Sequence, residues 1–292
     1  MVTPREELIR RILNWSRARD DVRAVVLFGS LAQPDARVDD MSDVDIELTF
    51  AVVTPELLAG SWWRDFGVVW TAYSLDPLPV WSLVYEGGLT VDLSVVDPSR
   101  IAGMVSAGKL SRVWERGYRV LLDRDGSTRG LPAPSGAMPE PGRLTHDEFR
   151  RLVDGFWVEV LRVPKYIARG ELWAVKSRDW TAKTRLLRML EWHAIVLGGH
   201  RVDGHGLGRG MPGWLPADLW HAVHGVFGRF DAADALHAYQ ASVEVFARAA
   251  GDVAAALGFS YPTDRDRLLR DFAEDLIRKV DADAVTAGTG AS

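Results

Sequence analysis

The chain of 292 residues contains no cysteine, which excludes disulfide bonds and thiolate chemistry. It has no apolar run near the roughly 20 residues that a membrane-spanning helix needs, and its charged, amphipathic start lacks the apolar core of a secretion signal. Basic residues are also in deficit, with 35 Lys and Arg against 40 Asp and Glu. This balance disfavours a nucleic-acid partner and tolerates a cationic small substrate. We expect a cytoplasmic monomer without membrane or nucleic-acid partners.

Apolar residues make up 47% of the chain, over a length typical of about two domains. The first part alternates like strands and the second has the spacing of amphipathic helices. A stretch rich in glycine and proline, residues 126–143, separates them. We therefore expect an α/β domain over residues 1–140, a helical domain over 141–280, and a disordered tail over 281–292. The strand-like segments are 22–28, 43–50, 68–71, 80–85, 89–96 and 119–122.

A Gly-Ser pair and two spaced aspartates stand out near the N-terminus. The apolar run 25–28 ends at Gly29 and Ser30, and Asp43 and Asp45 open the next strand-like run. Glycine after a strand lets a phosphate approach the backbone, and serine adds a hydroxyl and an amide donor. Because side chains alternate along a strand, both carboxylates leave the same face, where they suit Mg²⁺ shared with a substrate phosphate. We interpret the pattern as a metal and nucleotide site; a strand-ending turn beside a solvated strand edge is the alternative.

A third carboxylate, Asp92, lies on the polar face of the second strand of a hairpin. If this strand lies beside the first two, Asp92 comes near Asp43 and Asp45. There it would ligate a metal or remove a proton from an attacking hydroxyl; a salt-bridged sheet residue is the alternative. Glu86, just before the hairpin turn, is a second candidate for the base. Glu47 is expected to be a peripheral or solvated residue on the face of Asp45.

The helical part offers fewer chemical candidates. Lys165 follows Trp157 and Leu161 at i+4 steps, although Pro164 is expected to kink or break that helix. A lysine at the end of this stripe either reaches a triphosphate or is solvated. The glycine-rich loop 198–213 has no G-K-[ST] and is therefore not a P-loop. It is either a mobile loop or a lid over an acceptor.

Gly29-Ser30, the aspartate pair and Asp92 together resemble the signature of the nucleotidyltransferase superfamily. Further segments resemble the streptomycin, or aminoglycoside 6-, adenylyltransferases in order and spacing from about residue 5 to 278. These segments are YEGGLTVDLSVVD (85–97), VLLDRDG (120–126), GFWVEVLRVPKYIARGEL (155–172), LLRMLEWHAIVLGG (186–199) and FSYP (259–262).

The resemblance implies an α+β fold, with a mixed five-stranded sheet in a nucleotidyltransferase domain followed by an all-helical domain. It also implies Mg²⁺ as cofactor and ATP as co-substrate. The residues that it assigns to them are Asp43, Asp45 and Asp92 for two Mg²⁺ ions, with Asp92 as candidate base, Gly29 and Ser30 for the triphosphate, and Lys165 for phosphate. Leu31 departs from the pattern, because many relatives carry arginine after Gly-Ser.

The activity that follows from this resemblance is AMP transfer to one hydroxyl of a cationic antibiotic, the 6-hydroxyl of streptomycin. Carboxylates would pair with the guanidinium groups of the drug, and an aromatic ring would stack on it. The candidate substrate residues are Glu86, Glu159, Asp179 and Trp192. Three alternatives stay open: another acceptor such as a lincosamide or a protein hydroxyl, a nucleic-acid adenylyltransferase, and a nucleotide-binding module without turnover.

Overall fold

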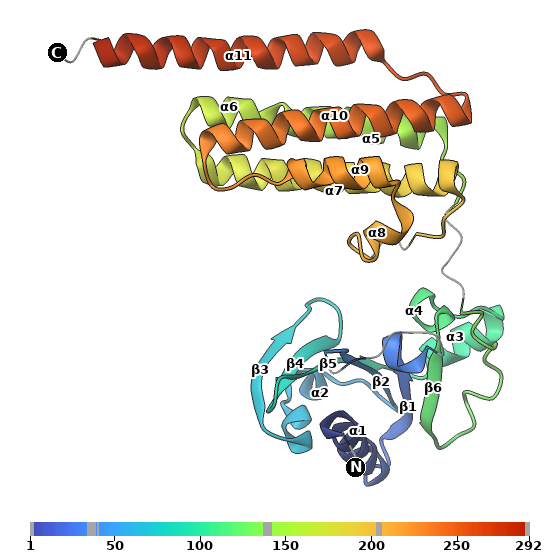
Figure 1. Cartoon of the computed structure of the whole chain (residues 1–292). Coiled ribbons are helices and arrows are strands. Elements are labelled where there is room, and N and C mark those ends of the chain that lie inside the picture. Colours follow the sequence, from blue (N-terminus) through green and yellow to red (C-terminus); the bar gives the residue numbers. More distant parts are fainter. Residues whose placement is uncertain (1–2, 34–38, 40, 137–141, 203–205, 290–292) are drawn as a thin grey trace. The chain divides into compact units, whose positions relative to one another are not determined.

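A computed structural model describes residues 3–33, 39, 41–136, 142–202 and 206–289. The chain forms two compact units, Met1–Pro139 and Glu140–Ser292, each described here by itself (Figure 1). The first combines helices with one sheet, and the second has helices only within its described ranges. The expected α+β class is therefore confirmed.

The first unit is built on a six-stranded mixed sheet of order β3-β4-β5-β2-β1-β6. Only β2 and β5 run parallel; the other neighbouring pairs are antiparallel. The resemblance implied five strands, whereas the structure pairs all six strand-like segments, because β6 runs along β1 as an outer strand. The strands are β1 (Val22–Phe28), β2 (Val44–Phe50), β3 (Val69–Ser74), β4 (Val80–Tyr85), β5 (Leu89–Val96) and β6 (Tyr118–Asp123).

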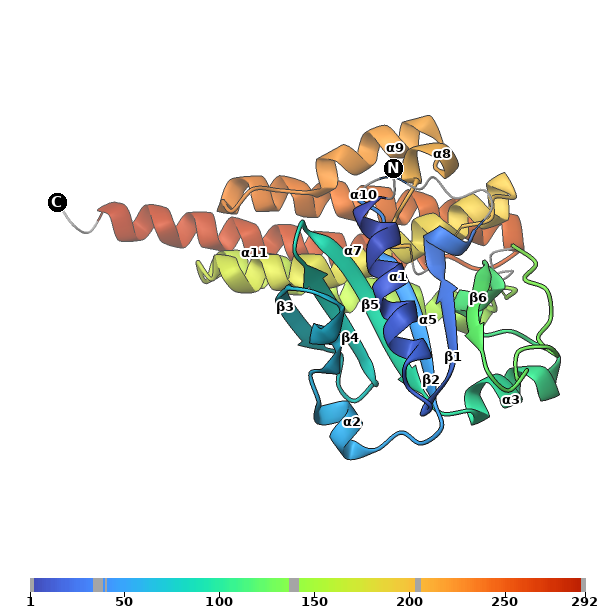
Figure 2. The same ribbon diagram turned by 90° about the horizontal axis from the view of Figure 1, so that it is seen from below.

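Alternation along the central strands gives the sheet two different faces. One face is apolar and buries residues such as Leu27, Ile46 and Leu93 against the first helix, α1, which Figure 2 shows in front of the sheet. The opposite face carries Val26 and Ala24, which pack against α3 and α4. The helical segments of this unit are α1 (Pro4–Arg17), η1 (Gly29–Ala32), α2 (Pro55–Ala59), η2 (Trp62–Phe66), α3 (Ser99–Ala107) and α4 (Arg112–Glu115).

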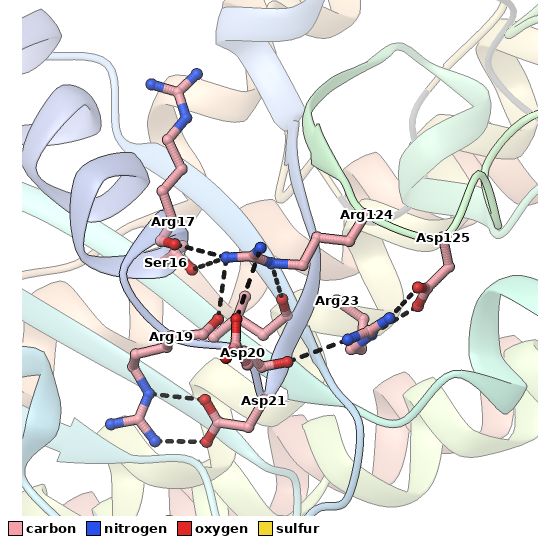
Figure 3. A network of polar contacts seen from close by, with 9 residues as sticks. Ser16, Arg17, Arg19, Asp20, Asp21, Arg23, Arg124 and Asp125 are labelled. Atoms are coloured by element: carbon pink, nitrogen blue, oxygen red, sulfur yellow. Dashed lines mark hydrogen bonds and ion pairs between the residues drawn. The ribbon is translucent and has the colours of Figure 1, made fainter.

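Arg124, just after β6, fastens the end of α1 to the sheet (Figure 3). Its guanidinium donates to the carbonyl oxygens of Arg17 at 2.6 Å and Arg19 at 3.2 Å, and its Nε donates to that of Val22 at 3.0 Å. The last carbonyl groups of a helix have no partner within the helix, and a cation there also opposes the negative end of the helix dipole. This contact therefore caps α1 and fixes its connection to β1.

The second unit packs its helices around one apolar core. Helix α5 begins at a capping box in which Thr145 and Glu148 satisfy each other's backbone amides. It ends at Leu161, where α6 takes over with Pro164 in its first turn, so the expected break near this proline is present. The helices are α5 (His146–Val160), α6 (Arg162–Ala168), α7 (Leu172–Gly198), α8 (Met211–Trp214), α9 (Ala217–Val223), η3 (His224–Val226), α10 (Ala232–Leu257) and α11 (Thr263–Thr289).

The C-terminal segment differs from the expected disordered tail. Helix α11 continues to Thr289, and residues 290–292 lie outside the described residues. Alanines recur in the segment after residue 280, and alanine has the highest intrinsic helix propensity. Across the described ranges, none of the helices unites the length and the apolar character required to traverse a bilayer.

Candidate active site

Gly29 brings the two halves of the N-terminal motif together. It ends β1 with a φ of +69°, a left-handed conformation that favours glycine. A Cβ atom placed on Gly29 would lie 1.9 Å from Oδ2 of Asp45, so any side chain here would collide with that carboxylate. The structure thus seats Asp45 directly against the Gly-Ser turn, and Ser30 follows within η1.

The parallel pairing of β2 and β5 sets Asp45 and Asp92 directly opposite each other. Side chains of such partners leave the same face of a sheet, so the expected approach of Asp92 to the first carboxylate pair is what the structure shows. Asp43 lies just before β2 and accepts a hydrogen bond from the Thr90 hydroxyl. Asp92 accepts one from the Ser82 hydroxyl at 2.6 Å. In the part of the chain that the structure describes, Asp45 has no hydrogen-bond or ion-pair partner.

Among these carboxylates, Asp45 is the one whose ionised form is disfavoured by its surroundings. Burial, followed by the charges of Asp92 and Asp43, raises the pKa of Asp45 to about 6. Desolvation and like charges both disfavour the ionised carboxylate, and a divalent cation would relieve both. The carboxylate oxygens are hard ligands of the kind that Mg²⁺ prefers. The residues present therefore fit a magnesium ion.

The arrangement does not form a complete cage of protein ligands. No group of three or more His, Asp or Glu side chains within the described ranges is placed to hold a metal by itself. The hydroxyls of Thr90 and Ser82 engage Asp43 and Asp92, two of the three carboxylates. Mg²⁺ usually takes one or two carboxylates and completes its shell with water and substrate phosphates. The ligand roles of Asp43, Asp45 and Asp92 stay predictions of that kind.

Glu47 differs from its expected solvated position. It is buried on the same face as Asp45 and accepts a 3.0 Å hydrogen bond from Nε of Arg100, in the first turn of α3. Burial raises the pKa of Glu47, and the charge of Arg100 partly offsets this effect. The signal in the sequence was its place on an internal strand, two residues after Asp45. The partner could not be found that way, because it comes from a helix 53 residues further along.

Glu86 does not join the carboxylate group. It follows β4 and lines a cavity of about 160 Å³ together with Glu7, Arg11 and Phe66. This cavity lies against α1, on the apolar side of the sheet, whereas Asp45 and Asp92 are on the opposite face. Its proposed contact with substrate stays a prediction.

The carboxylates predicted to bind the drug in the second unit already have basic partners. Glu159 pairs with Arg162 at 3.0 Å and with Arg178 at 3.8 Å. Asp179 accepts a hydrogen bond from Lys183, one turn further along α7. A guanidinium group of a ligand would have to replace these cations.

Two further candidates of the second unit lie in different environments. Trp192 is only 7% exposed, belongs to the apolar core and lies under the Arg188 guanidinium. Lys165 is exposed on α6, with its Nζ 5.7 Å from the centre of the Phe272 ring. The structure therefore places Trp192 as a packing residue and leaves Lys165 accessible.

Comparison with known proteins covers nearly the whole chain. The family model described as "Streptomycin adenylyltransferase" matches residues 2–276. An aminoglycoside 6-adenylyltransferase of Campylobacter jejuni is 21% identical over 88% of this chain and 90% of its own length. One from Bacillus subtilis (strain 168) is 25% identical over 67% of this chain and 70% of its own. The crystal structure of an aminoglycoside 6-adenyltransferase from Bacillus subtilis is similar with a TM-score of 0.45, 18% identity and coverage of 92% of this chain and 97% of that one.

These findings make the chain a nucleotidyltransferase, an enzyme that transfers a nucleotidyl group. Within that class, it belongs to the streptomycin adenylyltransferase family.

Proposed function

We propose that the enzyme transfers AMP from ATP to a hydroxyl group of an aminoglycoside, with the 6-hydroxyl of streptomycin as acceptor. The observation that carries the proposal is the Asp45–Asp92 pair seated against Gly29, in a chain that the family model matches over residues 2–276. The two curated relatives above carry the name aminoglycoside 6-adenylyltransferase. Their name supports both the class of acceptor and the position that is modified.

The residues of the first unit divide the chemistry among them. Gly29 lets the Asp45 carboxylate lie against the turn at the end of β1, and Ser30 offers a hydroxyl and an amide to the phosphates. Asp92 is fixed by its hydrogen bond from Ser82 and takes the proton of the acceptor hydroxyl. The acceptor oxygen then bonds to the α-phosphorus, the bond to the bridging oxygen breaks, and pyrophosphate leaves. Bound Mg²⁺, held by Asp45 with Asp43 or Asp92, supplies neutralisation of the phosphate charge.

Acceptor recognition is proposed for the acidic candidates of both units. The net charge of −5 favours the approach of a cationic drug. Glu86 has no basic ion-pair partner in the described ranges, whereas Glu159 and Asp179 must exchange theirs for a guanidinium group. Lys165 is exposed and remains our candidate for a phosphate contact.

One experiment distinguishes this proposal from two alternatives. These are a different acceptor, such as a lincosamide or a protein hydroxyl, and a nucleotide-binding module without turnover. Pyrophosphate release is measured with ATP or GTP against streptomycin, spectinomycin, kanamycin and lincomycin, and the product is located by mass spectrometry and NMR. We expect release only with ATP and streptomycin, with AMP on the 6-hydroxyl. Turnover with lincomycin alone would redirect the acceptor, and nucleotide binding without any release would overturn the enzymatic proposal.

We also propose that the enzyme acts as a monomer in the cytoplasm, where ATP is available, and without a nucleic-acid partner. The acidic balance of the chain supports the absence of a nucleic-acid partner. Light scattering on the purified protein measures its mass, and a dimer would contradict the proposal. RNA binding that weakens steeply with salt would contradict the absence of a nucleic-acid partner.

A further inference from the structure

The second unit contains an apolar pocket that none of the proposed chemistry uses. Its volume is about 240 Å³, and it lies between α7, the start of α8 and the segment from α9 to Phe227. Its buried base is aliphatic, and the rim is formed by large apolar side chains that remain exposed: 64% for Trp180, 60% for Phe227 and 89% for Leu207. The aliphatic lining consists of Leu186, Leu187, Leu190, Met211, Val223 and Val226.

One buried cation interrupts this apolar lining. The Lys183 side chain is 5% exposed, donates a hydrogen bond to Asp179, and holds its Nζ 5.2 Å from the centre of the Phe227 ring. An ammonium group has three N–H donors, and a single hydrogen bond to a protein acceptor is formed among the residues that the structure describes. Burial lowers the pKa of Lys183, although Asp179 opposes this shift. The pocket thus contains an N–H donor of Lys183 that has no protein acceptor among the described residues and little access to water.

The backbone at the rim supplies an independent observation. Leu207 has a φ of +50°, the only positive value of a residue other than glycine in the described part of the chain. For a bulky side chain this conformation is costly, and such strain is retained chiefly at ligand clamps and functional sites. Here it presents an almost fully exposed leucine at the edge of the pocket.

We propose that this pocket binds a small neutral organic molecule that has an apolar body and one oxygen acceptor, and that the oxygen accepts a hydrogen bond from Lys183. The size fits, because a dry apolar cavity of about 150 Å³ already accommodates benzene. Neutrality follows from charge: the Lys183–Asp179 pair sums to zero, so an anionic ligand would leave a buried excess charge. The binding requires neither ATP nor an antibiotic, and Asp179, the partner of Lys183, is the one residue that it shares with the proposed drug contacts.

The test uses the full chain without nucleotide and compares three probes by calorimetry. Acetophenone has the required ring and carbonyl oxygen, ethylbenzene lacks the oxygen, and benzoate adds a negative charge. We expect acetophenone to bind about 10-fold more tightly than either, because it alone offers Lys183 a neutral oxygen acceptor. The absence of acetophenone binding at its solubility limit, or equal affinities for the three probes, would overturn the proposal.

Variants locate the binding. Thr184 lies at the pocket and is exposed, so Thr184→Trp fills the mouth with little risk to folding; Thr181→Trp on the same helix is the matched control, because Thr181 does not line the pocket. We expect Thr184→Trp to lose at least 10-fold in affinity and Thr181→Trp to bind normally. The double variant Asp179→Asn with Lys183→Met leaves no unpaired buried charge and should bind acetophenone and ethylbenzene equally. Loss in the Thr181 control or a retained carbonyl preference in the double variant would refute binding in this pocket at Lys183.

Discussion

Acidic side chains in the two units differ in what the chain itself provides as partners. Within the described ranges, Asp92 of the first unit accepts a hydrogen bond from a hydroxyl, Asp45 has no hydrogen-bond partner, and neither has a basic partner. Glu159 and Asp179 of the second unit are each held by a basic side chain. Carboxylates left without a cation raise the free energy of the folded protein until a ligand supplies one. The first group is therefore arranged for an external cation, and the second group is stabilised without one.

The largest effect is expected at the uncompensated carboxylate. Asp45→Asn keeps the size of the side chain but removes the charge that a metal would bind, so pyrophosphate release should fall by about 10³-fold or more. Folding should persist, because the variant removes repulsion from a buried site. Steady-state pyrophosphate release and circular dichroism measure the two effects. Turnover within a factor of a few of the unaltered enzyme would contradict the metal role.

The opposite outcome is expected at the neutralised carboxylate. Asp179→Ala leaves the buried Lys183 ammonium without its counter-charge, which should lower the free energy of unfolding by about 3 kcal/mol. Urea unfolding at neutral pH measures this loss. Adding Lys183→Met should restore much of it, and an unchanged unfolding midpoint in the single variant would show that the pair contributes nothing.

The response to pH should sharpen the comparison further. The pKa of Asp45 is raised to about 6 in the folded protein, whereas an unfolded aspartate titrates near 3.9. The folded state therefore binds more protons in this window, and the metal-free enzyme should lose about 2 kcal/mol of stability as pH rises from about 4 through 6. The difference in unfolding free energy between the enzyme and Asp45→Asn, measured with EDTA, isolates this group. A difference that stays constant with pH, or grows in the opposite sense, would contradict the assignment.

The smallest effect is expected at Arg124, which donates hydrogen bonds to neutral carbonyl groups. Arg124→Ala removes the hydrogen bonds to the carbonyl oxygens of Arg17, Arg19 and Val22. The bonds to Arg17 and Arg19 are exposed and only that to Val22 is partly buried, so the loss in unfolding free energy should be about 1 kcal/mol. Turnover per folded molecule should not change. A large fall in turnover with unchanged stability would connect this end of the sheet to the reaction.

Local patterns sufficed for the parts of the fold that depend on alternation. The expected strand near Val26 is present because it is a run of apolar residues, and those near Ile46 and Leu93 are present because apolar and polar residues alternate. The turn at Gly29 was also predictable, because glycine between a strand and a polar residue is typical of a turn. The beginning of α7 at Leu172 is hard to predict from an apolar stripe, because Trp173 and Trp180 are exposed and interrupt that stripe.

Pairings between distant segments were beyond the sequence. Glu47 was expected to be solvated. The packing of α3 on the sheet brings Arg100 to it. Asp179 and Lys183 are four residues apart on one helix, so their spacing alone indicates an ion pair. The resemblance assigned Asp179 to the drug instead. The hydrogen bonds of Asp43 with Thr90 and of Asp92 with Ser82 likewise depend on how β5 pairs with β2 and β4.

The position of Arg124 also bears on how the chain is made. The carbonyl oxygens that it contacts lie 102–108 residues earlier. During synthesis, the last carbonyl groups of α1 therefore lack this capping contact until Arg124, which follows the last strand of the sheet, has left the ribosome. Fragments that stop before β6 lose this arginine together with the outer strand, so they should be poor candidates for expression as a stand-alone N-terminal unit.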